Sequence, residues 1–202
     1  MSKSLPPHIT LTDRFVTAVL YATTMHSKQS RKSTTNPYIC HPLGVASLVL
    51  EVGGDEDQAI AALLHDVAED CGGEPRLVDI EKMFGERVAL IVRGCSDSLT
   101  ESEDHKANWR ERKVLHLNHL ESADLDVSIV TAADKLHNAR AIATDLQTIG
   151  SDVWKRFNKE TNRDLIINYY KDIFKILKKK KVTDQLLNPL ASAIRIMEVI
   201  HE

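Results

Sequence analysis

Apolar residues recur every three or four positions along almost the whole chain of 202 residues, which is the spacing of one face of an α-helix. No stretch alternates apolar and polar residues as a strand would, and no Asn-Gly pair suggests a hairpin. Glycines and prolines divide the apolar stripes into segments of ordinary helix length. The sequence therefore predicts an all-α fold, a helical bundle in a single compact domain.

The stop signals also predict where the segments lie. We expect helices or helical segments at about 15–29, 43–52, 56–70, 74–85, 86–99, 108–120, 124–146, 162–181 and 184–202, with Thr12 as the first N-cap. Residues 31–42 contain two prolines and should form a loop, and residues 102–106 a polar connection. The domain should span 1–202, with a motif-bearing core at about 15–145 and C-terminal helices at about 160–202.

Charge and cysteine content exclude several classes of protein. The 26 basic and 29 acidic residues give a net charge of −3, whereas nucleic-acid and membrane-surface binders usually need a basic excess. The Lys178–Lys181 run ends a helix, where cations complement the helix dipole. No apolar run could span a membrane or direct secretion. Cys40, Cys71 and Cys95 form no disulfide or zinc pattern, so we expect reduced thiols in a cytoplasmic protein.

A cluster of acidic residues follows directly on an apolar segment in "AIAALLHDVAED", residues 59–70. In a continuous helix, His65 and Glu69 would share one face, and Asp66 and Asp70 the neighbouring face. A carboxylate beside a core is costly unless a cation or hydrogen bonds neutralise it. Because this segment contains no basic residue besides the histidine, we expect the cation to come from another side chain or from a metal.

Two other segments could complete a metal site. Asp134 interrupts the apolar run of a long helix, with Asn138 one turn later, and His41 starts a helix after the loop. Together His41, His65, Asp66 and Asp134 offer two imidazoles and two carboxylates. This set leaves coordination positions open and suits Mn²⁺ better than a closed zinc site, although Fe²⁺ and Co²⁺ fit the same ligands.

Each of these residues could also have a purely structural role when it is taken singly. His41 could cap a helix, and Asp134 could pair with Lys135 or Arg140. For Lys135 and Arg140 we favour a supporting role behind the metal ligands over direct contact with the substrate. The coincidence of three such segments with a basic pair in the preceding loop favours a functional site.

The pattern of a histidine, a His-Asp pair and a distant aspartate resembles the metal ligands of the HD phosphohydrolase superfamily. The segments "HSKQSRKSTTNPYICHPLGVASLV", "LLHDVAEDC", "FGERVALIVRGCSDSL" and "TAADKLHNARAI" resemble the hydrolase domain of RelA/SpoT proteins and its stand-alone relatives, the small alarmone hydrolases. The resemblance covers about 15–145. It implies an all-helical enzyme that uses Mn²⁺ to remove the 3′-pyrophosphate of (p)ppGpp, with no synthetase region.

The same resemblance implies roles for nine residues. The metal ligands would be His41, His65, Asp66 and Asp134. The acidic pair that manages the attacking water would be Glu69 and Asp70, and which of them is acid or base stays open. The nucleotide and its phosphates would be held by Arg31, Lys32 and Asn138.

The sequence departs from the family pattern near these residues. The "STTNP" loop is one residue longer than usual, Cys71 replaces a common threonine, Ala132 precedes Ala133 where leucine is frequent, and Ala141 also replaces a threonine. The last change motivates an alternative, an HD phosphatase acting on another nucleotide or NADPH. A catalytically silent nucleotide-binding module is a third reading, against which the intact acidic pair argues.

Three aromatic residues near the motifs, Trp109, Trp154 and Tyr169, could stack on a base but at helical spacing are more often core. The expected partner is a guanine nucleotide alarmone, with no nucleic acid and no membrane. Whether the protein forms a homo-oligomer stays open.

Overall fold

The computed structural model describes residues 9–97, 99, 108–157 and 161–200, and the regular structure among them is helical. Ser30 and Pro37 form one isolated β-bridge in the loop before the second helix. The all-α prediction is confirmed. The elements in chain order are α1 (Asp13–Met25), α2 (Cys40–Glu51), α3 (Glu56–Leu64), α4 (Val67–Cys71), α5 (Gly73–Phe84), α6 (Glu86–Cys95), α7 (Trp109–Ser122), α8 (Leu125–Ile149), the 3₁₀ helix η2 (Gly150–Arg156), α9 (Arg163–Lys179) and α10 (Asp184–Val199).

Several helix ends differ from the prediction. Thr12 caps α1 as expected, but the helix ends at Met25 instead of near residue 29. Helix α2 starts at Cys40, so that Pro42 lies in its first turn. Proline is tolerated there because the first backbone N–H groups of a helix have no intrahelical partner. The predicted connection at 102–106 falls outside the described residues.

The helix predicted over 56–70 is broken at the acidic motif, which corrects the sequence prediction. Helix α3 ends at Leu64 and α4 begins at Val67. The ring Nδ1–H of His65 donates to the backbone carbonyl of Ala62 at 2.8 Å. A continuous helix would pair that carbonyl with the N–H of Asp66, so the side chain competes with the helix. His65 and Asp66 therefore project from a turn between two helices.

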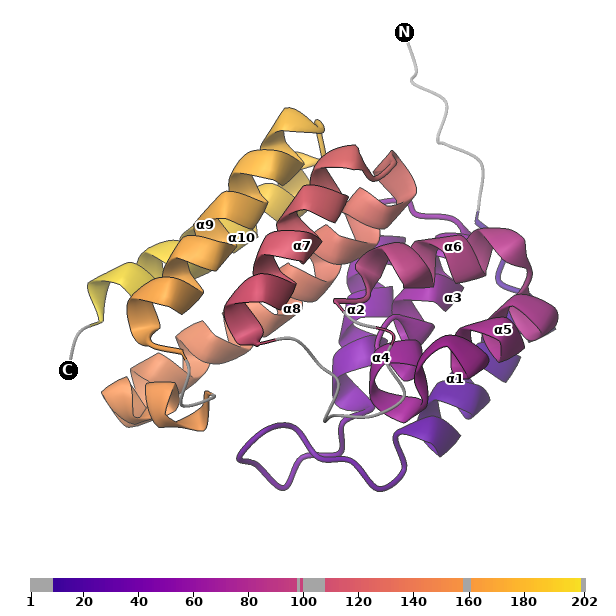
Figure 1. Cartoon of the computed structure of the whole chain (residues 1–202), viewed down its shortest axis with the longest axis horizontal. Helices are drawn as coiled ribbons and strands as arrows, with labels where there is room; N and C mark the ends of the chain where they lie inside the picture. The colour runs from indigo at the N-terminus through magenta and orange to yellow at the C-terminus, as the bar shows by residue number, and fades with distance from the viewer. Residues whose placement is uncertain (1–8, 98, 100–107, 158–160, 201–202) are drawn as a thin grey trace, which may run out of the picture.

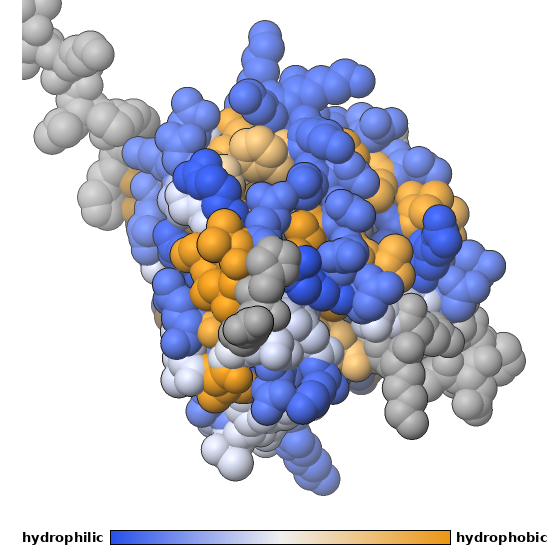
Figure 2. All heavy atoms as spheres, turned by 90° about the vertical axis from the view of Figure 1, so that its left-hand side faces the viewer, coloured by the Kyte–Doolittle hydropathy of each residue, from blue (hydrophilic) through white to orange (hydrophobic). Residues whose placement is uncertain are grey.

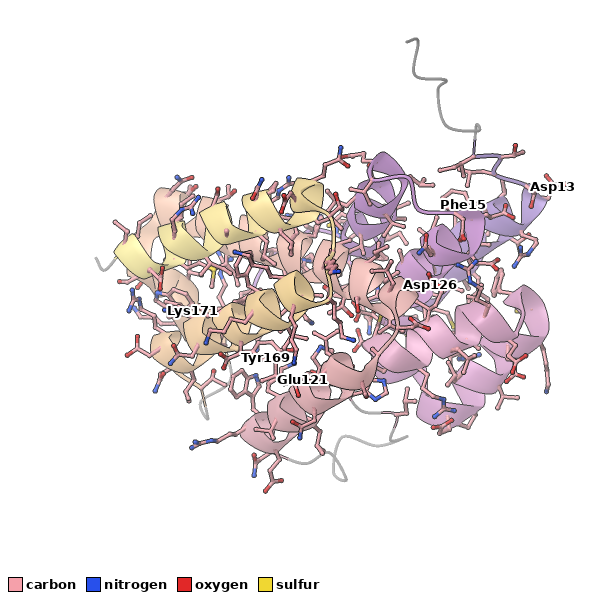
Figure 3. All side chains as sticks on the ribbon, turned by 90° about the horizontal axis from the view of Figure 1, so that it is seen from above. Asp13, Phe15, Glu121, Asp126, Tyr169 and Lys171 are labelled. Atoms are coloured by element: carbon pink, nitrogen blue, oxygen red, sulfur yellow. The ribbon has the colours of Figure 1, made fainter. Side chains whose placement is uncertain are left out.

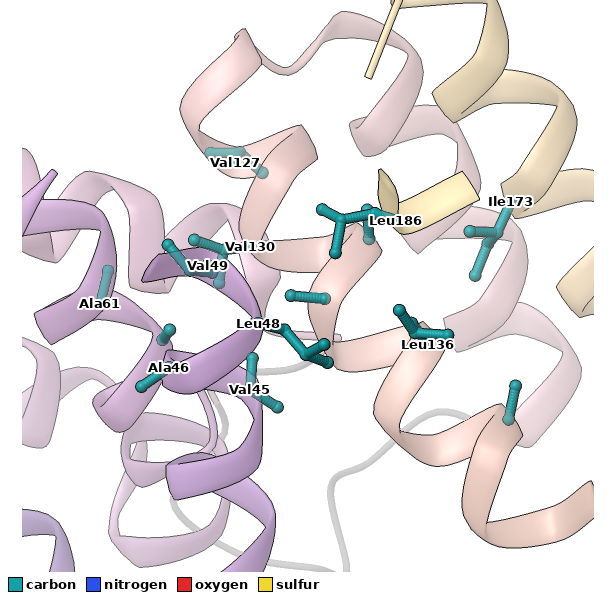
Figure 4. Packing of buried hydrophobic residues seen from close by; sticks show 14 of the residues in the cluster. Val45, Ala46, Leu48, Val49, Ala61, Val127, Val130, Leu136, Ile173 and Leu186 are labelled. Carbon is teal, nitrogen blue, oxygen red and sulfur yellow. The ribbon is translucent and has the colours of Figure 1, made fainter. Parts of the chain in front are cut away.

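Helix α8 lies between the two halves of the molecule. Figure 1 shows α1 to α6 gathered at one end and α9 with α10 at the other, with α8 running between them. Its buried side chains face α2, α6 and α10, against all of which α8 packs. In Figure 4, Val45 and Val49 of α2 lie between Ala61 of α3 and α8, and Leu136 of α8 points to the opposite side, toward α9. This placement puts the middle of α8 next to the start of α2.

Helices α7 and α9 complete the second half. Figure 3 shows Tyr169 projecting from α9 toward α7, where its ring makes an edge-on contact with Trp109, with centroids 6.0 Å apart. Hydrophilic residues predominate on the face seen in Figure 2, with apolar residues in patches. Among the described residues, no helix has both the length and the apolar character that crossing a membrane requires.

Candidate active site

Four side chains from three separate places converge on one point. His41 lies in the first turn of α2, His65 and Asp66 in the break between α3 and α4, and Asp134 in the middle of α8. His41 Nε2 lies 3.2 Å from Asp134 Oδ1 and 3.5 Å from Asp66 Oδ2. His65 Nε2 lies 3.0 Å from Asp66 Oδ2 and 3.8 Å from Asp134 Oδ1. The structure thus brings together the four residues that the sequence suggested as a metal set.

The donor atoms of this cluster suit a divalent cation. One ligand atom from each of His41, His65 and Asp66 lies within 4.8 Å of the others. His65 is 2% exposed, and its Nε2 is buried without a hydrogen bond of acceptable geometry in the described structure, although Asp66 is near. A buried ring nitrogen aimed at a pair of carboxylates is a common feature of metal sites, and two imidazoles with two carboxylates fit a transition metal.

Electrostatics at the cluster favour a positive charge between the carboxylates. Burial alone would lower the pKa of His65, but Asp66 and Asp134 outweigh it and hold this pKa well above its usual range. Burial likewise opposes ionisation of Asp66, yet His65 and His41 keep the pKa of that carboxyl well below its usual range. A metal ion that binds here therefore competes with the proton on His65.

His41 is oriented by a histidine that the sequence analysis did not single out. The Nδ1 atoms of His41 and His137 lie 2.9 Å apart. Burial and the neighbouring His41 lower the pKa of His137 to about 4, so His137 is neutral. A neutral His137 can accept the N–H of His41 Nδ1, and in that tautomer the Nε2 lone pair of His41 is available to a metal beside Asp66 and Asp134. A Cβ at Gly44 would lie 2.3 Å from His137 Nε2, so only glycine leaves room for the ring.

Tyr38 is a second residue that the sequence analysis missed. Its hydroxyl donates to Asp66 Oδ2 at 2.6 Å. Burial and the charge of Asp66 raise the pKa of Tyr38, so the phenol stays protonated and continues to donate. Nothing in the helical periodicity marks this loop residue.

Asp134 is held by side chains on both sides. Lys135 Nζ lies 2.7 Å from its Oδ2, and Asn138 Nδ2 donates to Oδ1 at 2.6 Å. Arg31 Nη2 in turn donates to Asn138 Oδ1 at 2.8 Å, which links the basic loop to α8. Of the two predicted partners, Lys135 makes the ion pair with Asp134. Arg140 borders a separate small groove with residues of α2 and α10. The role of both residues behind the metal ligands stays a prediction.

Glu69, the first residue of the acidic pair, lies beside a buried polar cluster. Glu69 Oε2 accepts the backbone N–H of Asp97 at 2.9 Å, and Arg112 Nη1 lies 3.7 Å from Oε1. Burial and the charge of Asp97 raise the pKa of Glu69. The Asp97 carboxylate is ion-paired with Lys113 and lies 3.0 Å from His116 Nδ1. The end of α6 and helix α7 therefore fix Glu69 from two sides, a contact that sequence spacing does not reveal.

A cavity of about 560 Å³ opens in front of these residues. The predicted site residues that line it are Arg31, Lys32, Asp66, Glu69, Asp70, Asp134 and Asn138. The two predicted histidines are buried behind this wall, within 3.8 Å of its carboxylates. The cavity wall thus carries the acids of the cluster, with the two imidazoles behind them, and the basic residues Arg31 and Lys32 line the same cavity.

The three cysteines and the three aromatic residues considered in the sequence analysis differ in whether they line the cavity. Cys40 is exposed and lines the cavity, whereas burial raises the pKa of Cys71 and of Cys95 to about 11, so both remain thiols. Trp109 and Tyr169 line the cavity from α7 and α9, and both also pack against the hydrophobic core. Trp154 packs on Phe157 with ring centroids 5.9 Å apart.

Replacing Lys135 with methionine should destabilise the metal-free protein by about 3–5 kcal/mol, because it leaves the buried Asp134 carboxylate without its cation. Urea unfolding in the presence of a chelator measures this loss. Lys171→Met is the control, since that lysine is 44% exposed in a surface ion pair and should cost less than about 1 kcal/mol. Equal effects of the two changes would contradict the prediction.

Comparison with known proteins places this site in a family. A model described as "HD domain" matches residues 18–163. MESH1 of Xenopus tropicalis, a guanosine-3′,5′-bis(diphosphate) 3′-pyrophosphohydrolase, is 36% identical over 140 residues, which cover 68% of this chain and 72% of MESH1. SpoT of Escherichia coli K12, a bifunctional (p)ppGpp synthase/hydrolase, is 33% identical over 146 residues, 71% of this chain and 20% of SpoT. A probable 3′-pyrophosphohydrolase of the same nucleotide from Synechocystis is 34% identical over 148 residues, 71% of this chain and 18% of that protein.

The fold of the chain agrees with these matches. The structure of a metazoan SpoT ortholog that hydrolyses ppGpp superimposes with a TM-score of 0.73 at 27% identity, over 93% of this chain and 97% of that one. A structure from Listeria monocytogenes gives a TM-score of 0.62 at 28% identity, over 78% of this chain and 96% of that one. The chain spans about a fifth of the two long bacterial relatives and most of the compact ones. It therefore belongs to the HD domain family and is homologous to the MESH1 and SpoT proteins.

Proposed function

We propose that this protein hydrolyses the 3′-pyrophosphate of (p)ppGpp, releasing pyrophosphate and GDP or GTP. The observation that carries the proposal is the cavity, which is lined by Asp66, Glu69, Asp70 and Asp134 with His41 and His65 directly behind these acids, and also by the basic residues Arg31 and Lys32. This charge pattern suits a highly anionic substrate whose phosphate must approach acidic groups. The activity named for the homologous MESH1 proteins supports the same substrate class.

We further propose that His41, His65, Asp66 and Asp134 hold a divalent cation, with Mn²⁺ as the preferred ion. Such an ion supplies charge stabilisation to the phosphoryl group under attack. His137 and Tyr38 fix the orientation of two of these ligands through the bonds described above. Fixing the ligand side chains in this way reduces the reorganisation that binding requires.

The chain's own acids then move the protons. Hydrolysis breaks the bond between the 3′-oxygen of the ribose and the first phosphorus, a water oxygen bonds to that phosphorus, and a proton must reach the departing 3′-oxygen. Glu69 and Asp70 both border the cavity, and the raised pKa of Glu69 favours it as the proton donor. Asp70 then accepts the proton of the attacking water.

Arg31, Lys32 and Asn138 bind the nucleotide in this scheme. Arg31 can hold a phosphate with two parallel N–H donors, and its bond to Asn138 links that grip to the helix that carries Asp134. We also infer that the chain acts as one domain over 1–202, because Ile166 and Tyr170 of α9 line the same cavity as the motif residues.

The test is release of pyrophosphate from ppGpp by metal-stripped protein with and without added Mn²⁺. We expect release of equal amounts of pyrophosphate and GDP, dependent on the metal. NADPH and ordinary mononucleotides are assayed in parallel, since Ala141 in the cavity wall motivates an alternative nucleotide substrate. Turnover of one of these with silence on ppGpp would replace the proposed substrate by the alternative.

A further inference from the structure

One face of α8 forms a wall along the whole cavity. Asp134, Asn138, Ala141 and Asp145 all line it, at spacings of four, three and four residues, which keep them on one side of the helix. The eleven residue steps from Asp134 to Asp145 correspond to about 16 Å along the helix axis. Asp145 therefore lies at the end of the cavity opposite the metal cluster.

The chemistry of the wall changes between these two ends. Beyond Asn138, the lining residues Ala141 and Ile142 are apolar. Apolar and aromatic lining residues also come from η2 and α9, namely Val153, Ile166 and Tyr170. A phosphate in this stretch would lose its hydration without gaining a partner, whereas the flat faces of a purine base suit it.

A charged pair closes the wall beyond the apolar stretch. Arg156 of η2 is ion-paired with Asp145 Oδ2, and both residues line the cavity. Their side chains are 22% and 38% exposed, so the pair is accessible. Beside it, Lys32 Nζ lies 5.9 Å from the centre of the Phe157 ring. The far end of the cavity thus offers an ionised acceptor and a planar donor next to an aromatic ring.

We propose that the Asp145–Arg156 pair binds the edge of the purine base and selects guanine over adenine, an inference that rests on the function proposed above. A carboxylate has more acceptor positions than one arginine contact uses, so Asp145 can bind a base as well. Guanine presents two adjacent N–H donors on its Watson–Crick edge, which one carboxylate accepts together, while O6 accepts from the guanidinium. Adenine presents a single donor beside an acceptor and cannot make the two-donor contact.

Asp145→Ala tests the proposal with two substrates that differ only in the base, ppGpp and its adenosine counterpart. We expect kcat/KM for ppGpp to fall about 10- to 100-fold and kcat/KM for the adenosine compound to change less than about threefold. Asp152→Asn is the matched control, because Asp152 is 64% exposed, pairs with Lys155 and lies outside the cavity lining. It should change neither value. Thermal unfolding checks that each variant folds.

An equal loss on both substrates would overturn the proposal, because Asp145 would then act on the shared phosphates through Arg156. No loss on either substrate would overturn it as well. Arg156→Gln should also reduce the preference for guanine.

Calorimetric binding of GDP and ADP separates this inference from the proposed hydrolysis. If wild-type protein turns over neither substrate yet prefers GDP, and Asp145→Ala removes that preference, the base site stands and the proposed reaction fails. Equal binding of GDP and ADP by the wild-type protein would overturn the base site.

Discussion

Replacing His65 with alanine should abolish tight Mn²⁺ binding and lower kcat/KM on ppGpp by about a thousandfold or more. The ring is buried, its Nδ1–H is used by the carbonyl of Ala62, and its Nε2 points at Asp66 and Asp134. Alanine removes one of the four proposed donors and leaves His41 as the single imidazole of the set beside Asp66 and Asp134. Loss of several kcal/mol of phosphoryl charge stabilisation corresponds to a rate loss of this size.

Equilibrium dialysis with Mn²⁺ and the pyrophosphate-release assay measure the two effects separately. His119→Ala is the matched control, because His119 is exposed on α7, away from the cluster, and should leave both unchanged. Thermal unfolding of the His65 variant shows whether it remains folded. A folded variant that binds Mn²⁺ as tightly as the wild type would remove His65 from the ligand set.

The fold was largely predictable because its signals are local. The apolar period and the Thr12 cap depend on neighbouring residues only, and the structure has helices α1 and α8 over most of the predicted segments, although α1 ends earlier and α8 ends later than predicted. The broken helix at His65 was not predictable from the period, because the apolar stripe continues across it. A side chain that bonds to its own preceding turn changes the backbone without changing the pattern.

The candidate site was predictable where residue type alone signals chemistry. Imidazoles and carboxylates are costly in apolar segments unless a cation or a polar partner compensates them, so the four proposed ligands could be chosen from the sequence. Residues that support them could not be chosen in this way. His137 meets His41 across 96 residues of chain, and Tyr38 meets Asp66 across 28. Such pairs depend on how α2, α4 and α8 pack, and a single sequence does not encode that in any periodic form.

The link between Asp97 and Glu69 shows the same limit and has a chemical consequence. The backbone of Asp97 positions the Glu69 carboxylate, while its side-chain charge, held by Lys113, disfavours ionisation of Glu69. The N–H of Asp97 by itself favours the ionised form, but burial and the Asp97 charge outweigh it, so the pKa of Glu69 is raised while its carboxyl is held in a fixed orientation at the cavity wall. A group that must protonate a departing oxygen near neutral pH needs both properties.

Glu69→Gln should therefore lower kcat on ppGpp about 100- to 10,000-fold while KM and Mn²⁺ affinity change little. Glutamine keeps the shape and an oxygen that accepts the N–H of Asp97, but it has no proton of suitable acidity to give. In the wild type, kcat should fall as the pH rises through the raised pKa of Glu69, because the donor is then ionised. The variant should lose that limb of the pH profile.

Glu74→Gln is the matched control, because Glu74 pairs with Arg93 on the surface and both side chains are about half exposed. Steady-state kinetics from pH 5 to 10 and dialysis with Mn²⁺ provide the measurements. Unchanged turnover in the Glu69 variant, with ppGpp still bound, would exclude Glu69 from proton transfer. Loss of turnover with retained binding of ppGpp and Mn²⁺ would distinguish an enzyme from a nucleotide-binding module, because a module that only binds has no use for an acid of raised pKa beside the proposed metal ligands.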